Sequence, residues 1–491
     1  MTSAPPMTMA SRTRTISLIV ILFAVFIDLI GVTILNVVIP SIQTNLHAGP
    51  AALQWIQVGY SLPLAVGIVS GARLGDLYGH KLIFIIGMAG VAVTSVLCAV
   101  ADTPGVLVGA RVAQGLFAAA AIPQVLSQIQ VMYSAQQRGG PMAAYSSLAG
   151  LAATVGPIVG PLLLKWNLLG QGWRMAFWVN VPFALIIVIA SAFLLPESKT
   201  PDAGSVDVLG VLISGAGLLL VLYPLTSAAN ASQWPVWSYV SIVAGLAVLA
   251  GFAAHQKRVS ARGGTPLVEM SLFRFRSAQG GLLVQFLFFV PTMGFFLVYM
   301  LFLQLGLGMS SLSAGLLMLP WSVAVLVFAM FAATMMLPRI GRLTIQLGVI
   351  VLAAGFALTA IVAGSATAQT GWNQLIWGVL IGGAGMGMLV APLMQLTLTD
   401  VPVESAGSGS ALYNTVTQLA ASVGIAVIGT VFFTGLRSGA RTTSSLPGQY
   451  GSAISTSLWV GIGLLVIAFA ASFLLPRHSP VASAAPAELS S

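Results

Sequence analysis

The sequence predicts an all-α membrane protein with fourteen transmembrane helices. Hydrophobic residues make up 58% of the 491 positions, and Asp, Glu, Lys and Arg together make up 6%. No soluble domain of this length can hide so much apolar surface, so the lipid bilayer must be its solvent. Apolar runs of about 20 residues, long enough for a helix to cross a bilayer core of about 30 Å, also recur along the whole chain.

The apolar runs follow one another with short loops between them. The first run, Ile16–Pro40, is too long for the core of a signal peptide and contains Asp28, so we interpret it as the first membrane helix. The expected spans are 16–40, 52–72, 82–101, 105–131, 143–165, 176–196, 207–227, 237–255, 278–303, 313–337, 343–365, 374–398, 409–435 and 455–476.

The basic residues indicate the orientation in the membrane. An even number of spans places both termini on one side, and that side holds fourteen of the nineteen Lys and Arg residues, against four on the other. In membrane proteins the cytoplasmic loops carry the excess of Lys and Arg. We therefore expect a multi-pass protein of the cell membrane (inner or plasma membrane) with both termini in the cytoplasm. The net charge of +9 is then a topology signal, and we expect no nucleic-acid partner.

Enzyme chemistry finds no support in the sequence. The four histidines, His47, His80, His255 and His478, are dispersed, and the single cysteine, Cys98, lies inside an apolar run. No group of residues has the spacing of metal ligands or of a catalytic set. We therefore expect no enzymatic activity, no cofactor and no metal.

The stretch GARLGDLYGHKL, residues 71–82, concentrates glycine and charge in the loop between spans 2 and 3. Glycines four residues apart allow helices to approach closely. We expect a gating loop in which Asp76 latches helix ends near Arg73 and Lys81; the alternative is an ordinary basic loop that obeys the topology rule. The loop resembles the spans 2–3 signature of the major facilitator superfamily, with matches that include Gly71, Asp76, Gly79 and Lys81.

A weaker echo of this loop, LPRIGRLT at residues 337–344, lies between spans 10 and 11. A repeat offset by eight spans predicts six-helix bundles at 16–196 and 278–476, two inserted transmembrane helices at 207–255, and cytoplasmic tails at 1–15 and 477–491. This layout is similar to that of the fourteen-span drug:proton antiporter branch of the superfamily.

Further stretches carry the same resemblance. RVAQGLFAAAAIP, from Arg111 in span 4, and GLAATVGPIVGPLLL, in span 5, resemble two superfamily signatures, of which the second is typical of exporters. GWRMAFWVNVP, PLVEMSLFRFRSAQ and SALYNTVTQLAASVGIAV resemble the branch at the starts of spans 6 and 9 and in span 13. The span 5 signature comprises Gly150, Gly156, Pro157, Gly160 and Pro161.

Asp28 is the candidate proton-coupling acid, with Arg111 as its partner. The branch places its acid five residues before Asn36, where this chain has Gly31, and Asp28 lies one turn earlier on the same helix face. At 1.5 Å per residue both side chains lie about 20 Å above the cytoplasmic side, which favours pairing. The alternatives are a structural role for Asp28 and an interfacial position for Arg111.

We expect a secondary transporter that exports lipophilic drugs or toxic small molecules in exchange for protons by alternating access, and that acts as a monomer in the bilayer. The alternatives are a dedicated exporter of one secondary metabolite, a proton-coupled importer, and a membrane receptor or scaffold. Polar or aromatic residues in apolar spans are the candidates for the substrate cavity, although helix packing also explains such residues. They are Asn36, Gln285, Tyr299, Gln304, Trp321, Gln395, Asn414 and Gln418.

Overall fold

The computed structural model describes residues 11–134, 137–166, 170–199, 206–228, 235–262, 264, 266–401, 406–442 and 445–477, and within them every regular element is a helix. The chain divides into two compact units, Met1–Leu267 and Val268–Ser491. Most of the residues in the two expected tails lie outside the described ranges.

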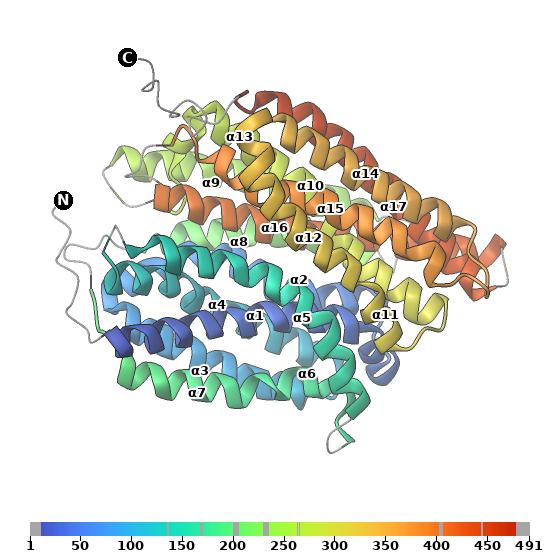
Figure 1. Ribbon diagram of the computed structural model, residues 1–491, viewed down its shortest axis with the longest axis horizontal. Coiled ribbons are helices and arrows are strands. Elements are labelled where there is room, and N and C mark those ends of the chain that lie inside the picture. The colour runs from blue at the N-terminus through green and yellow to red at the C-terminus, as the bar shows by residue number, and fades with distance from the viewer. Residues whose placement is uncertain are drawn as a thin grey trace, which may run out of the picture. The chain divides into compact units, whose positions relative to one another are not determined.

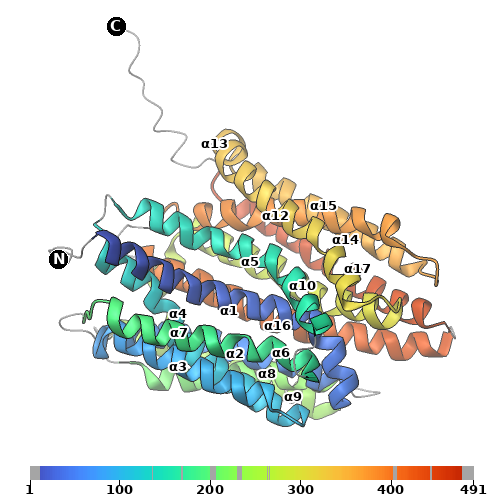
Figure 2. The ribbon, with the colours of Figure 1, turned by 60° about the horizontal axis from the view of Figure 1, so that its bottom comes forward.

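Nine helices form the first unit, within the described residues (Figures 1 and 2). The long helices α1 to α5 and α7 run side by side as a bundle in both views. The helices are α1 (Ser11–Leu46), α2 (Pro50–Tyr78), α3 (His80–Ala99), α4 (Pro104–Met132), α5 (Gly139–Trp166), α6 (Met175–Trp178), α7 (Asn180–Leu194), α8 (Val208–Ala228) and α9 (Val236–Ala261).

The second unit contains eight helices among the described residues. One expected span, 313–337, is built from α11, α12 and a π-helical segment, Ala332–Met336, that leads into α13. The helices are α10 (Arg276–Leu301), α11 (Ser311–Leu317), α12 (Leu319–Phe331), α13 (Leu337–Ile340), α14 (Leu343–Gly364), α15 (Trp372–Thr397), α16 (Ala406–Thr442) and α17 (Leu446–Ala471).

The helix count confirms the predicted fold class. Within the described residues, thirteen helical stretches are long and apolar enough to cross a membrane. The helix α5, with 28 residues, covers the remaining expected span at 143–165. Each of the fourteen predicted runs therefore has its helix.

Small residues set the packing of the first unit. Helix α4 packs against α2 and α3, and α1 packs against α5 and α7. A Cβ atom added to Gly71 would lie 1.9 Å from the backbone oxygen of Ala119, so α2 and α4 touch through their backbones at this point. This is the close approach that the glycine spacing predicts.

The helices α8 and α9 pack on each other, and α8 also packs on α2, so both belong to the first unit. Their outer faces are apolar and exposed: Val236 is 77% exposed and Leu212 is 63% exposed. An apolar face that no protein covers is expected of helices in contact with lipid.

Candidate functional site

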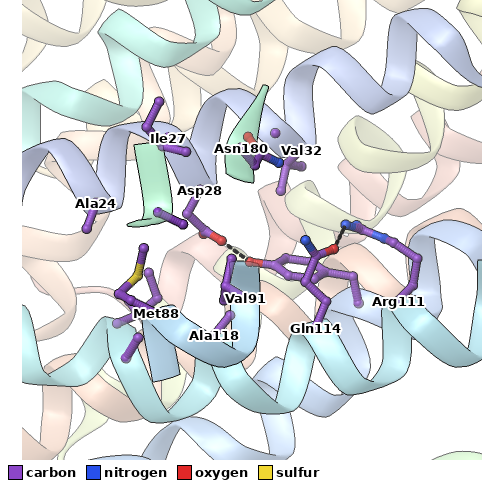
Figure 3. A pocket seen from close by; sticks show the side chains of 15 residues that line it. Ala24, Ile27, Asp28, Val32, Met88, Val91, Arg111, Gln114, Ala118 and Asn180 are labelled. Atoms are coloured by element: carbon purple, nitrogen blue, oxygen red, sulfur yellow. Dashed lines mark hydrogen bonds between the residues drawn. The ribbon is translucent and has the colours of Figure 1, made fainter. Parts of the chain in front are cut away.

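A pocket opens inside the first unit (Figure 3). Its fifteen lining residues come from α1, α2, α3, α4 and α7, and all of them belong to this unit. Ten are apolar or glycine. The polar five are Asp28, Tyr60, Arg111, Gln114 and Asn180.

Asp28 projects from α1 into this pocket and is half-buried. The hydroxyl of Tyr60, on α2, donates a hydrogen bond to Asp28 Oδ1. Gly31 lines the same pocket, and a Cβ atom at that position would lie 3.5 Å from Asn180 Nδ2. The position of the branch acid and the position of the acid in this chain therefore face one space.

Arg111 is 5% exposed, so its side chain lies inside the helix bundle. Its Nε donates to the backbone oxygen of Ile56 at 3.1 Å, and its Nη1 donates to Gln114 Oε1 at 2.7 Å. Gln114 in turn donates from Nε2 to the hydroxyl of Ser95 at 2.8 Å. A chain of hydrogen bonds thus holds the guanidinium group between α2 and α3.

The expected partnership of Asp28 and Arg111 takes an indirect form. The guanidinium carbon of Arg111 lies 4.3 Å from the centre of the Tyr60 ring, and the hydroxyl of the same tyrosine binds Asp28. No ion pair joins Asp28 to Arg111 within the part of the chain that the structure describes, because Tyr60 lies between them. Figure 3 shows the two charged groups at opposite ends of this arrangement.

Sequence reasoning missed Tyr60, Gln114 and Asn180 as members of the site. Two of them carried a signal, because Gln114 follows Arg111 by three residues inside the span 4 motif and Asn180 is the asparagine of the span 6 motif. Tyr60 carried none, since it lies in an unremarkable apolar run of span 2.

Residues 71–82, which were expected to form a loop, are helical except at Gly79: they comprise the end of α2 and the start of α3, and they are fastened to α4. Gln124, on α4, donates to the backbone oxygen of Gly71 at 2.7 Å, and its Oε1 lies 2.8 Å from His80 Nδ1. Gly79 has a φ of +110°, a conformation that side chains with a Cβ rarely adopt. Glycine at position 79 therefore permits the sharp turn between the two helices.

Asp76 lies in the last turn of α2. It lies 3.5 Å from Arg73 Nη1 and 3.6 Å from His80 Nε2. Of the two basic residues expected beside Asp76, Arg73 makes one of these contacts, and the other is made by His80, which was not expected there. The latch itself stays a prediction.

The span 5 signature brings α5 against α1. A Cβ atom at Gly156 would lie 1.8 Å from Thr33 Oγ1, and one at Gly160 would lie 3.5 Å from Ile34 Cα. Pro161 is buried. The surroundings of Gly150 and Pro157 fall outside the described residues.

None of the eight candidate cavity residues lines the pocket around Asp28. Tyr299 and Trp321 are 0% and 2% exposed and lie in an aromatic cluster with Phe295, which stacks on both. Asn36, Gln304 and Gln418 are half-buried, and Gln395 is exposed. Their role in cargo binding stays a prediction.

The two remaining candidates, Gln285 and Asn414, make hydrogen bonds in the second unit. Gln285 accepts a bond at 2.5 Å from the hydroxyl of Tyr413 and donates one at 2.8 Å to Thr417. Asn414 donates to the backbone oxygen of Ser410 at 3.1 Å. The two bonds of Gln285 link α10 to α16 and fix its amide, whereas the bond of Asn414 lies within α16.

The chain is similar to one known protein family and to solved structures. The Major Facilitator Superfamily matches residues 21–425. The structure is similar to the crystal structure of a bacterial homolog of the human lysosomal transporter Spinster in an inward-facing, unoccupied conformation. The TM-score is 0.66 at 16% identity, over 95% of this chain and 98% of that one. At this identity the likeness shows the fold alone.

Three curated relatives share a larger part of the sequence. A protein of Streptomyces coelicolor named "Probable actinorhodin transporter" is 39% identical over 87% of this chain and 73% of its own length. The "Multidrug efflux pump LfrA" of Mycolicibacterium smegmatis is 30% identical over 91% of this chain and 87% of its own. The "Tetracenomycin C resistance and export protein" of Streptomyces glaucescens is 28% identical over 81% and 72%.

Proposed function

The chain belongs to the major facilitator superfamily of secondary transporters and is related to drug and antibiotic exporters, and from this premise we propose that it exports lipophilic small molecules in exchange for protons. The observation that carries the coupling is the placement of Asp28. It is a carboxyl group at mid-span, in a pocket whose walls are mostly apolar and whose other polar groups include a buried arginine.

A carboxyl group in such a place can bind and release a proton during a transport cycle. An apolar environment disfavours its charged form, whereas the hydroxyl of Tyr60 and the nearby Arg111 favour it. Because these effects oppose each other, a small movement of α1 against α2 and α4 changes the balance between the two forms. Alternating access supplies movements of this kind.

The proposed direction is outward. It is supported by the span 5 signature, of which Gly156 and Gly160 lie against α1, and by relatives that are named for efflux or export. A proton-coupled importer would transport the same compounds in the opposite direction. Uptake into inverted membrane vesicles under an imposed proton gradient distinguishes the two, since an exporter accumulates its cargo there.

A dedicated exporter of one compound is the second candidate. The relative with 39% identity is named for a single compound, whereas relatives at 28–30% identity include pumps named for many drugs. Growth inhibition by a broad panel of toxic compounds, in a host without its own pumps, decides between them. Protection against one compound supports the dedicated exporter, and protection against several unrelated ones supports the multidrug pump.

The central test replaces the acid. We expect Asp28→Asn to abolish proton-driven export, because an amide keeps the shape of the side chain but binds no proton in this range. The matched control is Asp102→Asn, the same change at an 89%-exposed side chain that pairs with Arg174. Near-normal coupled efflux by an Asp28→Asn protein present in the membrane at the wild-type level would contradict the proposal. Absence of gradient-dependent flux in the wild type would instead favour a receptor or scaffold.

A further inference from the structure

The guanidinium group of the buried Arg111 contacts neutral groups. Two neutral acceptors, the Ile56 carbonyl and the Gln114 amide, hold its guanidinium group, and the flat face of Tyr60 covers it. The carboxyl group of Asp28 lies on the hydroxyl side of the same ring. One tyrosine therefore contacts both charges.

The separation of Asp28 from Arg111 by the Tyr60 ring affects how readily Asp28 binds a proton. A carboxylate in direct contact with an arginine in apolar surroundings is strongly stabilised and resists protonation. A carboxyl group alone in the same surroundings keeps its proton instead. A single hydrogen bond from a phenol, with the arginine held one ring away, gives a stabilisation between these extremes. That intermediate state is the one in which a proton can be both bound and released.

The geometry of α2 keeps the ring in this place. Ile56, which holds Arg111, and Tyr60, which covers it, are one helical turn apart on α2. A Cβ atom at Gly115, on α4, would lie 2.3 Å from the backbone oxygen of Tyr60, so the backbones of α2 and α4 are in contact beside the ring. Any shift between α2 and α4 must move the tyrosine and the arginine contacts together.

Among the described residues, the other titratable groups near the pocket are an uncharged thiol and an uncharged phenol. Helix α3 contributes the thiol of Cys98, which lies 4.0 Å from Gln114 Oε1, and α5 contributes the phenol of Tyr145. Helix α7 contributes Asn180 and Ala184, neither of which titrates. The charge balance around Asp28 is thus set by Tyr60 and Arg111.

We propose that Tyr60 is the positioning residue that tunes proton exchange at Asp28: its hydroxyl stabilises the carboxylate, and its ring prevents a direct ion pair with Arg111. The proposal rests on the proposed function, in which Asp28 is the group that exchanges the proton. The proton binds to a carboxylate oxygen of Asp28 and leaves from it, and Tyr60 keeps its own proton throughout.

The test uses two substitutions that separate the hydroxyl from the ring. Tyr60→Phe removes the hydrogen bond and keeps the ring, so the carboxylate loses a stabilising partner. Tyr60→Leu removes the ring as well, so Arg111 can reach Asp28 and pair with it. The measurement is the infrared carboxyl band of the full-length protein in lipid, followed as a function of pH, with Asp28→Asn as the blank.

We expect the two substitutions to move the midpoint of the Asp28 titration, the pH at which half of its carboxyl band is lost, in opposite directions. Tyr60→Phe should raise the pH at which half of the Asp28 band is lost by about one unit, the effect of one hydrogen bond to a charged group. Tyr60→Leu should lower it, and the double variant Tyr60→Leu/Arg111→Gln should cancel that decrease. Tyr223→Phe, which removes a phenol hydroxyl from a 55%-exposed side chain on α8, should leave the midpoint unchanged.

Two results would overturn the proposal: midpoints that move in the same direction in Tyr60→Phe and Tyr60→Leu, or a midpoint in Tyr60→Phe that equals the wild-type value. If Tyr60→Leu fails to fold, Tyr60→Phe still decides the role of the hydroxyl. Because the infrared band reports protonation without transport, its shifts can appear in a protein that exports nothing. Failure of the proposed function and failure of the role of Tyr60 are therefore distinguishable.

Discussion

Two positions on α1, Asp28 and Gly31, line the same pocket one helical turn apart. The drug:proton antiporter branch that this chain resembles has its acid at the position of Gly31, and this chain has its acid at Asp28. The 3.5 Å between a Cβ atom at Gly31 and Asn180 Nδ2 is an ordinary van der Waals contact, so a side chain fits there. Both positions can therefore present a carboxyl group to the pocket.

We predict that moving the acid restores part of the coupling. The double variant Asp28→Ala/Gly31→Asp should export several-fold more than Asp28→Ala under the same proton gradient, because its carboxyl group enters the same pocket. It should not reach the wild-type rate, since the hydrogen bond from Tyr60 is made at position 28. Initial rates of cargo accumulation in inverted vesicles measure this. A double variant no better than Asp28→Ala, at equal protein levels, would contradict it.

At the scale of single residues the sequence predicts the charges and misses what lies between them. An acid and an arginine in the middle of apolar spans are rare enough to be recognised without a structure. A tyrosine in an apolar span is ordinary. The role of Tyr60 depends on the packing of α2 against α4, which places it between Asp28 and Arg111. These two residues are 83 positions apart in the chain, so no local sequence pattern encodes the arrangement.

At the scale of helices, the contact between α2 and α4 rests on glycine. The atoms nearest to a Cβ added at Gly71 belong to the backbone of Ala119 and Ala120, which cannot rotate away as a side chain can. Gly109 is on α4, as the two alanines are, and a Cβ atom added to it would have no atom within 4 Å. The two positions form a matched pair for the same substitution.

We predict that Gly71→Ala lowers the unfolding temperature by about 2 °C, through overpacking of about 2 kcal/mol. Gly109→Ala should leave it unchanged or raise it slightly, since alanine is the better helix former. Thermal unfolding of both variants in the same detergent measures the difference. An equal effect of the two substitutions would show that α2 and α4 have room to separate at position 71.

The hairpin of α8 and α9 is joined at one end by Asp207. This carboxylate accepts from the backbone nitrogen of Gly210 and from Gln256 Nε2, both at 2.8 Å, and lies 3.0 Å from His255 Nε2. The first bond caps α8, and the other two link it to α9. Sequence analysis predicts the two spans but not this link, because the partners lie 48 and 49 residues away.

We predict that Asp207→Ala destabilises the start of α8 by about 1 kcal/mol, the typical cost of a lost helix cap. Asp207→Asn should cost less, because the amide oxygen can still accept from Gly210. Hydrogen exchange at the first turn of α8 measures the effect, with the first turn of α10 as the internal reference. Equal protection in wild type and Asp207→Ala would show that the rest of the hairpin suffices to hold this helix end.

At the scale of the whole molecule, composition and run length predict the helices well and their ends less well. Helix α1 spans Ser11–Leu46, beyond the expected 16–40, because a helix continues through polar residues such as Gln43 and Thr44 after the apolar run has ended. Hydropathy locates the part of a helix that lies in lipid, while capping and packing decide where it stops. The π-helical segment Ala332–Met336 has no sequence signal of this kind.

The charge of the whole chain bears on which cargo it can carry. Of the ten acidic residues, Asp28 is the one that lies at the middle of a predicted span, and the buried Arg111 is its counterpart. A bilayer solvates charge poorly, so each positive charge on a cargo needs a carboxylate or a hydrated path at mid-depth. A second positive charge has no further acid there to neutralise it, at a cost of several kcal/mol.

We therefore predict that neutral and singly charged lipophilic molecules are exported and that long dications are exported poorly or not at all. Apolar and aromatic walls with a few amides and hydroxyls satisfy a neutral molecule, and a monocation can use the one carboxylate when its proton has left. Efflux of matched mono- and dicationic dyes of similar size and hydrophobicity, measured side by side in the same cells, tests this. Asp28→Asn should then reduce export of the monocation and of the neutral dye alike, since both depend on the proton. If the dication is exported as fast as the monocation, a second acid must face the cargo. Asp28 would then not be the group that limits the charge of the cargo.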